Sequence, residues 1–219
     1  MKIGIFGGSF NPVHYGHLRT CEELIEKASL DKVIFIPTNI TSNKQETAIN
    51  SCSRFEMVRM AIASNAKFEA SDIEIKRGGV SFSYNTIKEL KEIYNGDELF
   101  FIIGFEAFTE IKNWKKSHQL FEMTNFIIIN RGMDIKTKSE NLALISKYIP
   151  EPVRNKITVD ISRDRLVIYP ENISIFLLEV TMLDISSTKI RNNFKKKLSN
   201  RFLLPNDTIE YIINNNIYV

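Results

Sequence analysis

The stretch "MKIGIFGGSFNPVHYGHLRT" (residues 1–20) joins a short apolar run to two glycines, a proline and two histidines. Residues 2–6 have the continuous apolar character of a buried strand, and Leu18, Cys21 and Leu24 recur at the spacing of a helix. A strand that leads through a glycine-rich turn into a helix is typical of an α/β sheet. In such sheets, ligands bind beyond the carboxyl ends of the strands, where the strand order reverses.

The two histidines of this stretch indicate an anion site. His14 and His17 lie three residues apart at the start of the expected helix, so their imidazoles share one face. Gly7 and Gly8 let the backbone approach an anion closely, and the helix N-terminus offers free N–H groups. Two neighbouring imidazoles can donate hydrogen bonds to one phosphate chain as charge builds up on it. The pattern therefore points to phosphoryl or nucleotidyl transfer.

The same residues have other interpretations. The glycines can simply form a turn, with the histidines capping the helix or lying on the surface. A metal site has little support, because no third or fourth ligand stands nearby. The spacing does not match the dinucleotide-binding fingerprint, and the chain contains no Walker-type phosphate loop. From the pattern alone, the phosphate site and the simple turn both remain open.

Two further apolar runs extend the strand–helix pattern. "ELFFIIG" (98–104) and "NFIIIN" (125–130) are continuous, as in strands that are buried on both faces. Their alternation with helical segments predicts an α/β fold with a Rossmann-like, doubly wound parallel sheet and helices on both faces. Ser53 is expected to cap a helix, with Glu56 completing a capping box. The segment 68–79 is expected to form one or two short strands.

The segment 133–172 has a different character. It is polar, with a short helical stretch near 139–148, and "ITVDISRDRLVIY" (157–169) alternates apolar and polar residues around a polar turn. We therefore expect a surface hairpin over 157–169. The whole chain, 1–219, is expected to form a single domain with 133–172 as a variable insertion and a small C-terminal helical part.

Composition narrows the class of protein. Hydrophobic residues make up 43% and charged residues 25% of the 219 residues, as in soluble globular proteins. No run of about 18 apolar residues predicts a membrane span. Cys21 and Cys52 have no metal-ligand or redox spacing, which is typical of reduced thiols in a cytoplasmic protein. The net charge of +3 does not indicate nucleic acid, although it suits phosphate ligands. A homo-oligomer remains open.

Two motifs at opposite ends of the chain resemble signatures of a known superfamily. "GGSFNPVHYGH" (7–17) resembles the nucleotidyltransferase signature G-x-F-x-P-x-H-x-G-H, and "ISSTKIR" (185–191) resembles that superfamily's second signature, I-S-S-T-x-I-R. Three finer matches resemble the bacterial nicotinate mononucleotide adenylyltransferases: "SFSYNTIKEL" (81–90), "FFIIGFEAF" (100–108) and "IKNWKK" (111–116). The resemblance extends over nearly the whole chain except 133–172.

The resemblance implies adenylyl transfer from ATP to nicotinate mononucleotide, with Mg²⁺, giving deamido-NAD and pyrophosphate. His14 and His17 would contact the ATP phosphates. Neither needs to remove a proton, because the nucleophile is already a phosphate oxygen. The other residues implied for ATP are Gly7, Gly8, Ser9, Phe10, Lys44, Gly104, Glu106, Ser186, Ser187, Thr188 and Arg191. Those implied for nicotinate mononucleotide are Ser83, Asn85, Thr86 and Trp114, and no residue is implied as a metal ligand.

Several positions depart from the family pattern. Asn43 replaces a histidine of the loop that usually reads P-P-H-K. Asn85 and Glu106 each stand where aspartate is usual, and Phe82 replaces a tyrosine. Arg54 matches an arginine near the next helix start.

Related proteins define the alternatives. Phosphopantetheine adenylyltransferases usually carry threonine at the position of His14, and cytidylyltransferases of the glycerol-phosphate type lack the tryptophan segment. Class I tRNA synthetases have a related histidine pair but need far more chain. A non-catalytic nucleotide sensor with the same fold is the alternative from another class. Four intact residues argue against it, because a pure binder need not keep groups that act in the transition state: His14, His17, Ser187 and Arg191.

Overall fold

The computed structural model describes residues 1–41, 49–130 and 137–218. Its contacts divide the chain into two compact units, each formed from two stretches of sequence. Unit 1 comprises Met1–Ile5 and Phe82–Val180, and unit 2 comprises Phe6–Ser81 and Thr181–Val219. Strand β1 (Lys2–Gly8) supplies residues to both units.

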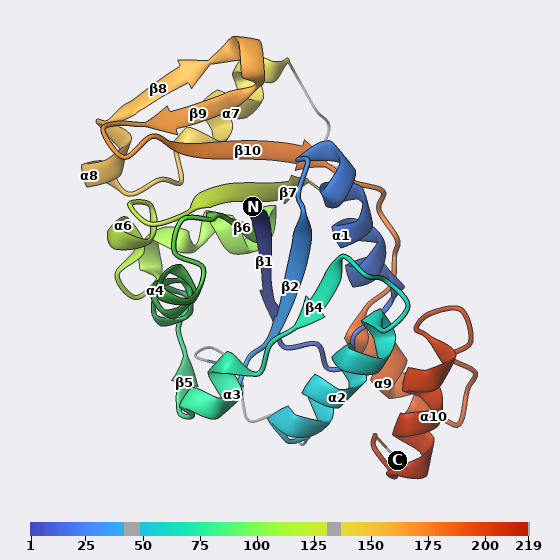
Figure 1. Ribbon diagram of the computed structural model, residues 1–219. Helices are drawn as coiled ribbons and strands as arrows, with labels where there is room; N and C mark the ends of the chain where they lie inside the picture. The colour runs from blue at the N-terminus through green and yellow to red at the C-terminus, as the bar shows by residue number, and fades with distance from the viewer. Residues whose placement is uncertain (42–48, 131–136, 219) are drawn as a thin grey trace. The chain divides into compact units, whose positions relative to one another are not determined.

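Unit 2 holds the first strand–helix repeats and the last two helices. Its other elements are α1 (Tyr15–Lys27), β2 (Lys32–Pro37), β3 (Ile40–Thr41), α2 (Ser51–Ile62), β4 (Phe68–Ala70), α3 (Ile73–Arg77), β5 (Val80–Ser81), α9 (Ser187–Lys195) and α10 (Asn206–Asn214). β2 pairs with β4 in parallel, and the short β3 pairs with β5 in parallel. Helix α10 packs against α2 (Figure 1), so a helix near the end of the sequence lies beside one from its first third.

Unit 1 holds the remaining strands. Its elements are α4 (Ser83–Ile93), β6 (Glu98–Gly104), α5 (Phe105–Thr109), the 3₁₀ turn η1 (Ile111–Asn113), α6 (Ser117–Leu120), β7 (Asn125–Asn130), α7 (Lys138–Ser146), α8 (Glu151–Arg154), β8 (Ile157–Asp160), the 3₁₀ turn η2 (Ile161–Arg163), β9 (Arg165–Ile168) and β10 (Ile173–Glu179). β6, β7 and β10 pair in parallel, and β10, β9 and β8 pair antiparallel. Helix α7 packs on β9 and β10.

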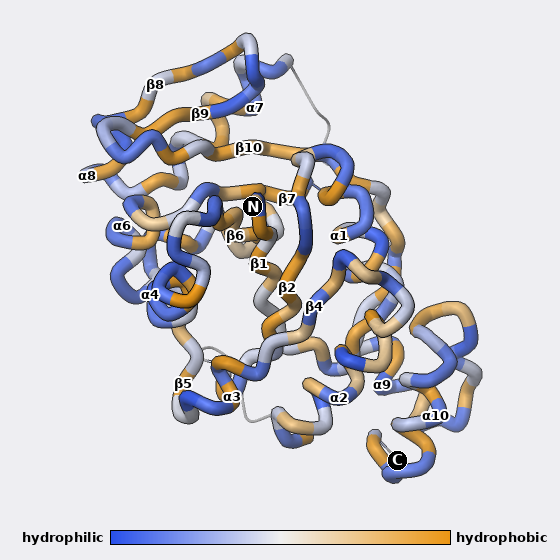
Figure 2. The backbone as a smooth tube through the Cα atoms, in the orientation of Figure 1, coloured by the Kyte–Doolittle hydropathy of each residue, from blue (hydrophilic) through white to orange (hydrophobic). Residues whose placement is uncertain are grey.

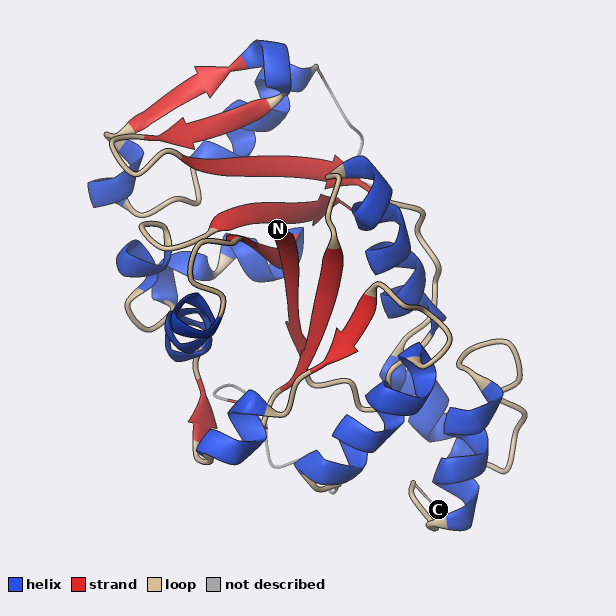
Figure 3. Ribbon diagram, in the orientation of Figure 1, coloured by secondary structure: helices blue, strands red, loops and turns tan. Residues whose placement is uncertain are grey.

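The strands follow one another in the hydrogen-bonded order β4-β2-β1-β6-β7-β10-β9-β8 (Figure 3). The mostly parallel sheet with surrounding helices confirms the predicted fold class. Chain order runs outward from β1 through β2 and β4 on one side and through β6, β7 and β10 on the other, so the strand order reverses beside β1. The carboxyl end of β1 is therefore the position at which α/β sheets bind ligands.

Continuous apolar runs form buried strands inside the sheet. The side chains of 33–37 in β2 and 126–129 in β7 are buried, as expected for strands covered on both faces. Figure 2 shows hydrophobic residues concentrated along β7 and β10. The predicted strands at 98–104 and 125–130 are confirmed.

The predicted capping box at Ser53 is wrong. Helix α2 is capped by Asn50, whose side chain accepts a hydrogen bond of 2.7 Å from the Ser53 N–H. Asparagine is among the strongest N-cap residues, so the helix begins two residues before Ser53. Glu56 instead pairs with Arg59 at 2.8 Å.

The predicted strands in 68–79 are only partly present. Residues 68–70 form β4, but Ile73–Arg77 form helix α3. Gly78 ends this helix at a φ of 74°, and its N–H bonds to the carbonyls of Glu74 and Ile75. A glycine at positive φ is a common helix C-terminus, and here it outweighs the alternating pattern that suggested a strand.

The hairpin expected over 157–169 is present as β8 and β9, but β9 does not lie on the surface. It pairs with β10 as well as with β8, and Leu166, Val167 and Ile168 are at most 2% exposed. Of these two strands, only β8 lies at an edge of the sheet. The sequence pattern predicted that β8 pairs with β9, but it did not predict that β9 also pairs with β10.

Across the described parts of the chain, no helix combines the length and the apolar character that crossing a lipid bilayer requires.

Candidate active site

The two histidines lie at the start of α1, directly after the loop that leaves β1. His14 is the N-cap residue of the helix, and His17 is in its first turn. Their rings stack with centroids 3.7 Å apart and planes 28° apart. The His14 backbone N–H donates to Nδ1 of His17 at 3.2 Å. Because Nδ1 is thus an acceptor, neutral His17 carries its proton on Nε2, where it can be donated to a ligand.

Aromatic rings support His17. The ring of Phe10 lies 5.2 Å from that of His17, and Phe6 packs edge-on against Phe10 at 5.6 Å. Phe10 is buried at a φ of 43°, a conformation that non-glycine residues rarely adopt and that tight packing has to hold. A Cβ on Gly8 would lie 3.1 Å from the Phe10 ring, whereas one on Gly7 would meet nothing within 4 Å. Gly8 therefore makes room for Phe10, and Gly7 is the glycine with open space beside it.

Gly16 makes room for the other imidazole. A Cβ at this position would lie 3.0 Å from Nδ1 and 3.1 Å from Cε1 of His14. The His14 side chain is 4% exposed, so it has little space into which it could move. The glycine of the H-x-G-H motif is thus needed for the orientation of the first histidine.

The second motif forms the N-terminus of α9. The Ser186 side chain caps this helix by accepting a 3.2 Å hydrogen bond from the Lys189 N–H. The Ser187 hydroxyl donates to the Pro12 carbonyl at 2.8 Å. That contact uses the only hydroxyl proton of Ser187, so a donor toward an anion here comes from the first N–H groups of the helix, which have no intrahelical partner.

Arg191 connects the second motif to the first. Its Nη1 donates to the Asn11 carbonyl at 2.8 Å, and its Nη2 donates to Oγ1 of Thr188 at 3.1 Å. These contacts join residues 180 positions apart within unit 2. A guanidinium has five N–H donors, so two contacts leave further donors for phosphate oxygens. The structure thus brings His14, His17, Ser9, Phe10 and the second motif together around one loop.

Arg54 holds the loop after β1 through backbone carbonyls, a role that the motif pattern did not reveal. Its side chain is 1% exposed, and it donates to the carbonyls of Ser9, Thr38 and Asn39. Burial lowers the pKa of Arg54, and nearby Tyr218 and Glu74 oppose that shift. The guanidinium thereby ties the loop after β1 to the end of β2. Sequence position alone, at a helix start, did not distinguish this anchor from a ligand contact.

Unit 1 holds the residues expected for the nicotinate ring. Ser83, Asn85 and Thr86 lie in the first turn of α4, and Thr86 is buried with its hydroxyl 3.4 Å from the Phe82 carbonyl. Trp114 follows η1 and packs edge-on against Phe101 at 6.2 Å. The first turn of α4 contains no acidic residue, because position 85 is asparagine.

Two lysines join the tryptophan segment to α4. Nζ of Lys115 lies 4.3 Å from the ring centre of Phe82, and Nζ of Lys116 lies 4.5 Å from that of Tyr84. These are cation–π distances. The structure thus brings the tryptophan segment and the start of α4 together within unit 1, and it places two positive charges beside a helix N-terminus.

The other expected residues of unit 1 lie at the end of β6. Gly104 caps α5 and has open space where a side chain would be, and Glu106 is exposed in the first turn of that helix. Lys44 and Asn43 lie outside the described residues.

The donor set around the loop after β1 contains imidazole, hydroxyl, guanidinium and backbone N–H groups. Within 1–41, 49–130 and 137–218, no three His, Cys, Asp or Glu side chains lie together as a metal site would require. Mg²⁺ is usually held by substrate phosphates with one or two carboxylates and several waters. These residues therefore suit a metal that is held by phosphate oxygens rather than by a cage of side chains.

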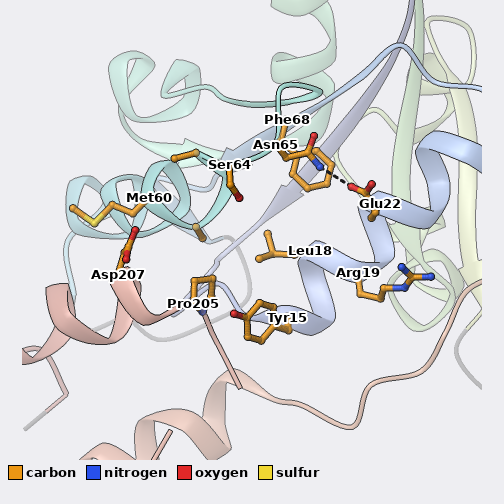
Figure 4. A pocket seen from close by; sticks show the side chains of 12 residues that line it. Tyr15, Leu18, Arg19, Glu22, Met60, Ser64, Asn65, Phe68, Pro205 and Asp207 are labelled. Atoms are coloured by element: carbon orange, nitrogen blue, oxygen red, sulfur yellow. Dashed lines mark hydrogen bonds between the residues drawn. The ribbon is translucent and has the colours of Figure 1, made fainter. Parts of the chain in front are cut away.

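A cavity of about 660 Å³ lies on another face of α1 (Figure 4). Tyr15, Leu18 and Glu22 line it from α1, together with Phe68 and Pro205 from other segments of unit 2. Neither imidazole of the H-x-G-H motif lines this cavity. It is therefore separate from the histidine pair, although Tyr15 is the next residue after His14.

Comparisons with known proteins show the family to which the chain belongs. A model of the cytidylyltransferase-like family matches residues 5–193. A protein of Geotalea daltonii named "probable nicotinate-nucleotide adenylyltransferase" is 37% identical over 219 residues, which cover 100% of this chain and 98% of the relative. A protein of the same name from Desulfatibacillum aliphaticivorans is 37% identical, with 100% of both chains covered. The nicotinic acid mononucleotide adenylyltransferase of Plasmodium falciparum, solved in complex with NaAD, has the same fold, with a TM-score of 0.71 at 22% identity over 99% of this chain and 97% of that one. This chain therefore belongs to the cytidylyltransferase-like family and, within it, to the nicotinate-nucleotide adenylyltransferases.

Proposed function

We propose that this protein transfers the adenylyl group of ATP to nicotinate mononucleotide, giving nicotinate adenine dinucleotide and pyrophosphate. The observation that carries this proposal is the direct contact of the two motifs, in which Arg191 and Ser187 bond to the loop that leads to His14. The relatives named above carry the same activity in their names. A solved neighbour of the fold was crystallised with the dinucleotide product, NaAD.

The reaction needs positioning and charge stabilisation more than proton transfer. A phosphate oxygen of the mononucleotide attacks the α-phosphorus of ATP, and the bond from that phosphorus to the oxygen bridging to the β-phosphate breaks. The attacking oxygen is already deprotonated at neutral pH, so no general base is required. The Nε2 proton of His17 is a donor for the oxygen on which charge accumulates.

The leaving pyrophosphate calls for a second set of donors. The N-terminus of α9 provides backbone N–H groups and the positive end of a helix dipole. The free donors of Arg191 add a charge-assisted contact to the outer phosphates. Mg²⁺ would enter with ATP on the phosphate oxygens, where it neutralises part of the charge of the leaving group.

The acceptor side explains a preference for nicotinate. N–H groups at the start of α4, with Lys115 and Lys116 nearby, favour a carboxylate on the ring over a carboxamide. A carboxamide would turn an NH₂ donor toward those donors and leave polar groups unpaired, at a cost of about 1–3 kcal/mol each. Trp114 can stack on either ring, so it adds affinity without discrimination.

Pyrophosphate release tests the proposal. The purified protein is given Mg²⁺-ATP with nicotinate mononucleotide, nicotinamide mononucleotide or phosphopantetheine, and CTP with glycerol 3-phosphate. We expect turnover with ATP and nicotinate mononucleotide, with kcat/KM at least about tenfold above that for the nicotinamide analogue. Equal efficiency with both mononucleotides would contradict the assigned acceptor. A lack of turnover with every pair would favour a nucleotide-binding protein.

His17→Ala tests the chemistry within the same assay. Loss of one donor to the transition state costs on the order of 3 kcal/mol, or about a hundredfold in kcat, with a smaller change in the KM for ATP. Exposed Glu26 lies on the same helix, and Glu26→Ala serves as the matched control. An unchanged kcat in His17→Ala would refute the assigned role of the histidine pair.

A further inference from the structure

Tyr218 reaches the phosphate-binding loop from the segment that follows α10. After this helix the chain turns back, and the Ile217 N–H bonds to the Ile212 carbonyl at 2.9 Å. The Tyr218 ring then stacks on Phe194 of α9, with centroids 6.0 Å and planes 27° apart. Its hydroxyl donates to Oδ1 of Asn11 at 2.6 Å. Residues 207 positions apart thus share a short hydrogen bond within unit 2.

Asn11 accepts hydrogen bonds through both its side chain and its backbone carbonyl. It is 8% exposed, and its carbonyl accepts the 2.8 Å hydrogen bond from Arg191. Tyr218 therefore holds the side chain of Asn11 while Arg191 holds its backbone. The next residue, Pro12, accepts the Ser187 hydroxyl. A change at the Asn11 side chain should therefore reach both the arginine and the residues leading to His14.

The phenol of Tyr218 stays protonated beside two cations. Burial raises the pKa of Tyr218, and this effect exceeds the opposing influence of Arg191 and Arg54. A neutral hydroxyl can donate to the Asn11 amide oxygen, whereas a phenolate could not. Burial therefore favours the protonated form of Tyr218 that this contact requires.

We propose that Tyr218 is a positioning residue for adenylyl transfer, whose hydroxyl orients Asn11 and, through it, Arg191 and the histidine loop toward the ATP phosphates. This inference rests on the proposed function. It adds a residue outside both sequence motifs to the machinery that binds ATP. It also predicts that the effect is specific to ATP, because the contacts of Tyr218 lie on the phosphate-binding loop and α9.

Tyr218→Phe tests the hydroxyl alone, because phenylalanine keeps the ring that stacks on Phe194. We expect kcat/KM for ATP to fall about tenfold while the KM for nicotinate mononucleotide stays within about twofold. Tyr211→Phe removes another tyrosine hydroxyl, on α10, and should leave both parameters unchanged. A purely structural role would lower the melting temperature without this difference between substrates, so a wild-type kcat/KM for ATP would overturn the proposal.

A double-mutant cycle tests whether the effect passes through Asn11. If Tyr218 acts by orienting that side chain, Tyr218→Phe should have no further effect on kcat/KM for ATP in an Asn11→Ala background. The same tenfold loss in both backgrounds would show that the hydroxyl acts independently of Asn11 and would overturn the assigned route. Circular dichroism and thermal melting confirm that each variant is folded.

Binding of a non-hydrolysable ATP analogue separates this inference from the proposed function. If the wild-type protein released no pyrophosphate with nicotinate mononucleotide, the proposed acceptor would fail, but calorimetric titration would still report on the phosphate site. We expect Tyr218→Phe to bind the analogue about fivefold more weakly than Tyr211→Phe does. Equal affinities in the two variants would refute the positioning role, whatever the acceptor.

Discussion

At the scale of single residues, His14, Gly16 and His17 of the H-x-G-H motif have separate physical roles. The backbone of His14 sets the tautomer of His17, and the missing side chain of Gly16 leaves room for the His14 ring. The glycine is therefore required for orientation and not for backbone flexibility, since it lies within a regular helix. A substitution at Gly16 can therefore change the activity without a matching change in stability.

Gly16→Ala should reduce activity without reducing stability. Alanine favours a helix by up to about 1 kcal/mol over glycine, and this gain offsets the strain of the new contact with His14, so the free energy of unfolding should change little. The new Cβ would press on His14, whose buried ring has to move, and we expect kcat to fall about tenfold or more. Steady-state kinetics and urea unfolding measure the two quantities. A stable variant with full activity would show that the orientation of His14 is not critical.

At the scale of elements, Glu23 links α1 to the segment that follows β10. Its carboxylate is 6% exposed, forms ion pairs with Arg19 at 2.8 Å and Lys27 at 3.0 Å, and accepts the Thr181 N–H at 3.1 Å. Burial alone would raise the pKa of Glu23, but the hydrogen bonds from Thr181, Lys27 and Arg19 lower it to about 2. One carboxylate thereby holds the chain that leads from the sheet to the second motif.

The lowered pKa gives a pH dependence of stability. Because the folded pKa is below the ordinary value of 4.5, the contribution of Glu23 is fully present above about pH 4.5 and is lost as pH falls toward 2. This contribution is about 3 kcal/mol. Glu23→Gln should lose it already at pH 7 and should show a flatter unfolding free energy between pH 5 and pH 3. Denaturant unfolding across that range, with Glu26→Gln as the exposed control, measures the difference. Parallel curves for wild type and Glu23→Gln would contradict the assignment.

The β8–β9 hairpin should tolerate a shorter turn but not removal. Replacement of residues 161–164 by Asn-Gly keeps the Asp160–Arg165 pair in register and should leave folding and turnover intact. Deletion of both strands would expose β10 and remove the buried side chains of β9, at a cost of more than about 4 kcal/mol. Urea unfolding of the two variants provides the comparison. A stable deletion variant would show that β10 can serve as the edge of the sheet.

At the scale of the whole molecule, the features that could be predicted from the sequence are those that leave a local pattern in it. Continuous apolar runs identified the parallel strands, and the two motifs identified the loop after β1 and the start of α9. These inferences succeed because burial on both faces and helix capping leave a signal within a few residues of chain.

Contacts between distant positions could not be predicted in the same way. No periodicity links Tyr218 to Asn11, and nothing in the pattern around Arg54 shows that its guanidinium would bond to three carbonyls. The resemblance implied that Ser187 contacts ATP, but nothing in the sequence showed that its hydroxyl donates to the Pro12 carbonyl. Such choices depend on which donors and acceptors the folded chain brings within about 3 Å, and that information arises only when the elements pack.

Trp114 gives the molecule a built-in optical reporter. It is the only tryptophan of the chain, it is partly exposed, and it packs edge-on against Phe101 beside the segment expected to hold the pyridine ring. Indole emission therefore comes from a single place, and a pyridine ring stacking on it would quench that emission. If nicotinate mononucleotide binds there as proposed, its binding with and without ATP could be followed by stopped-flow fluorescence on the unlabelled protein, with no dye and no substitution.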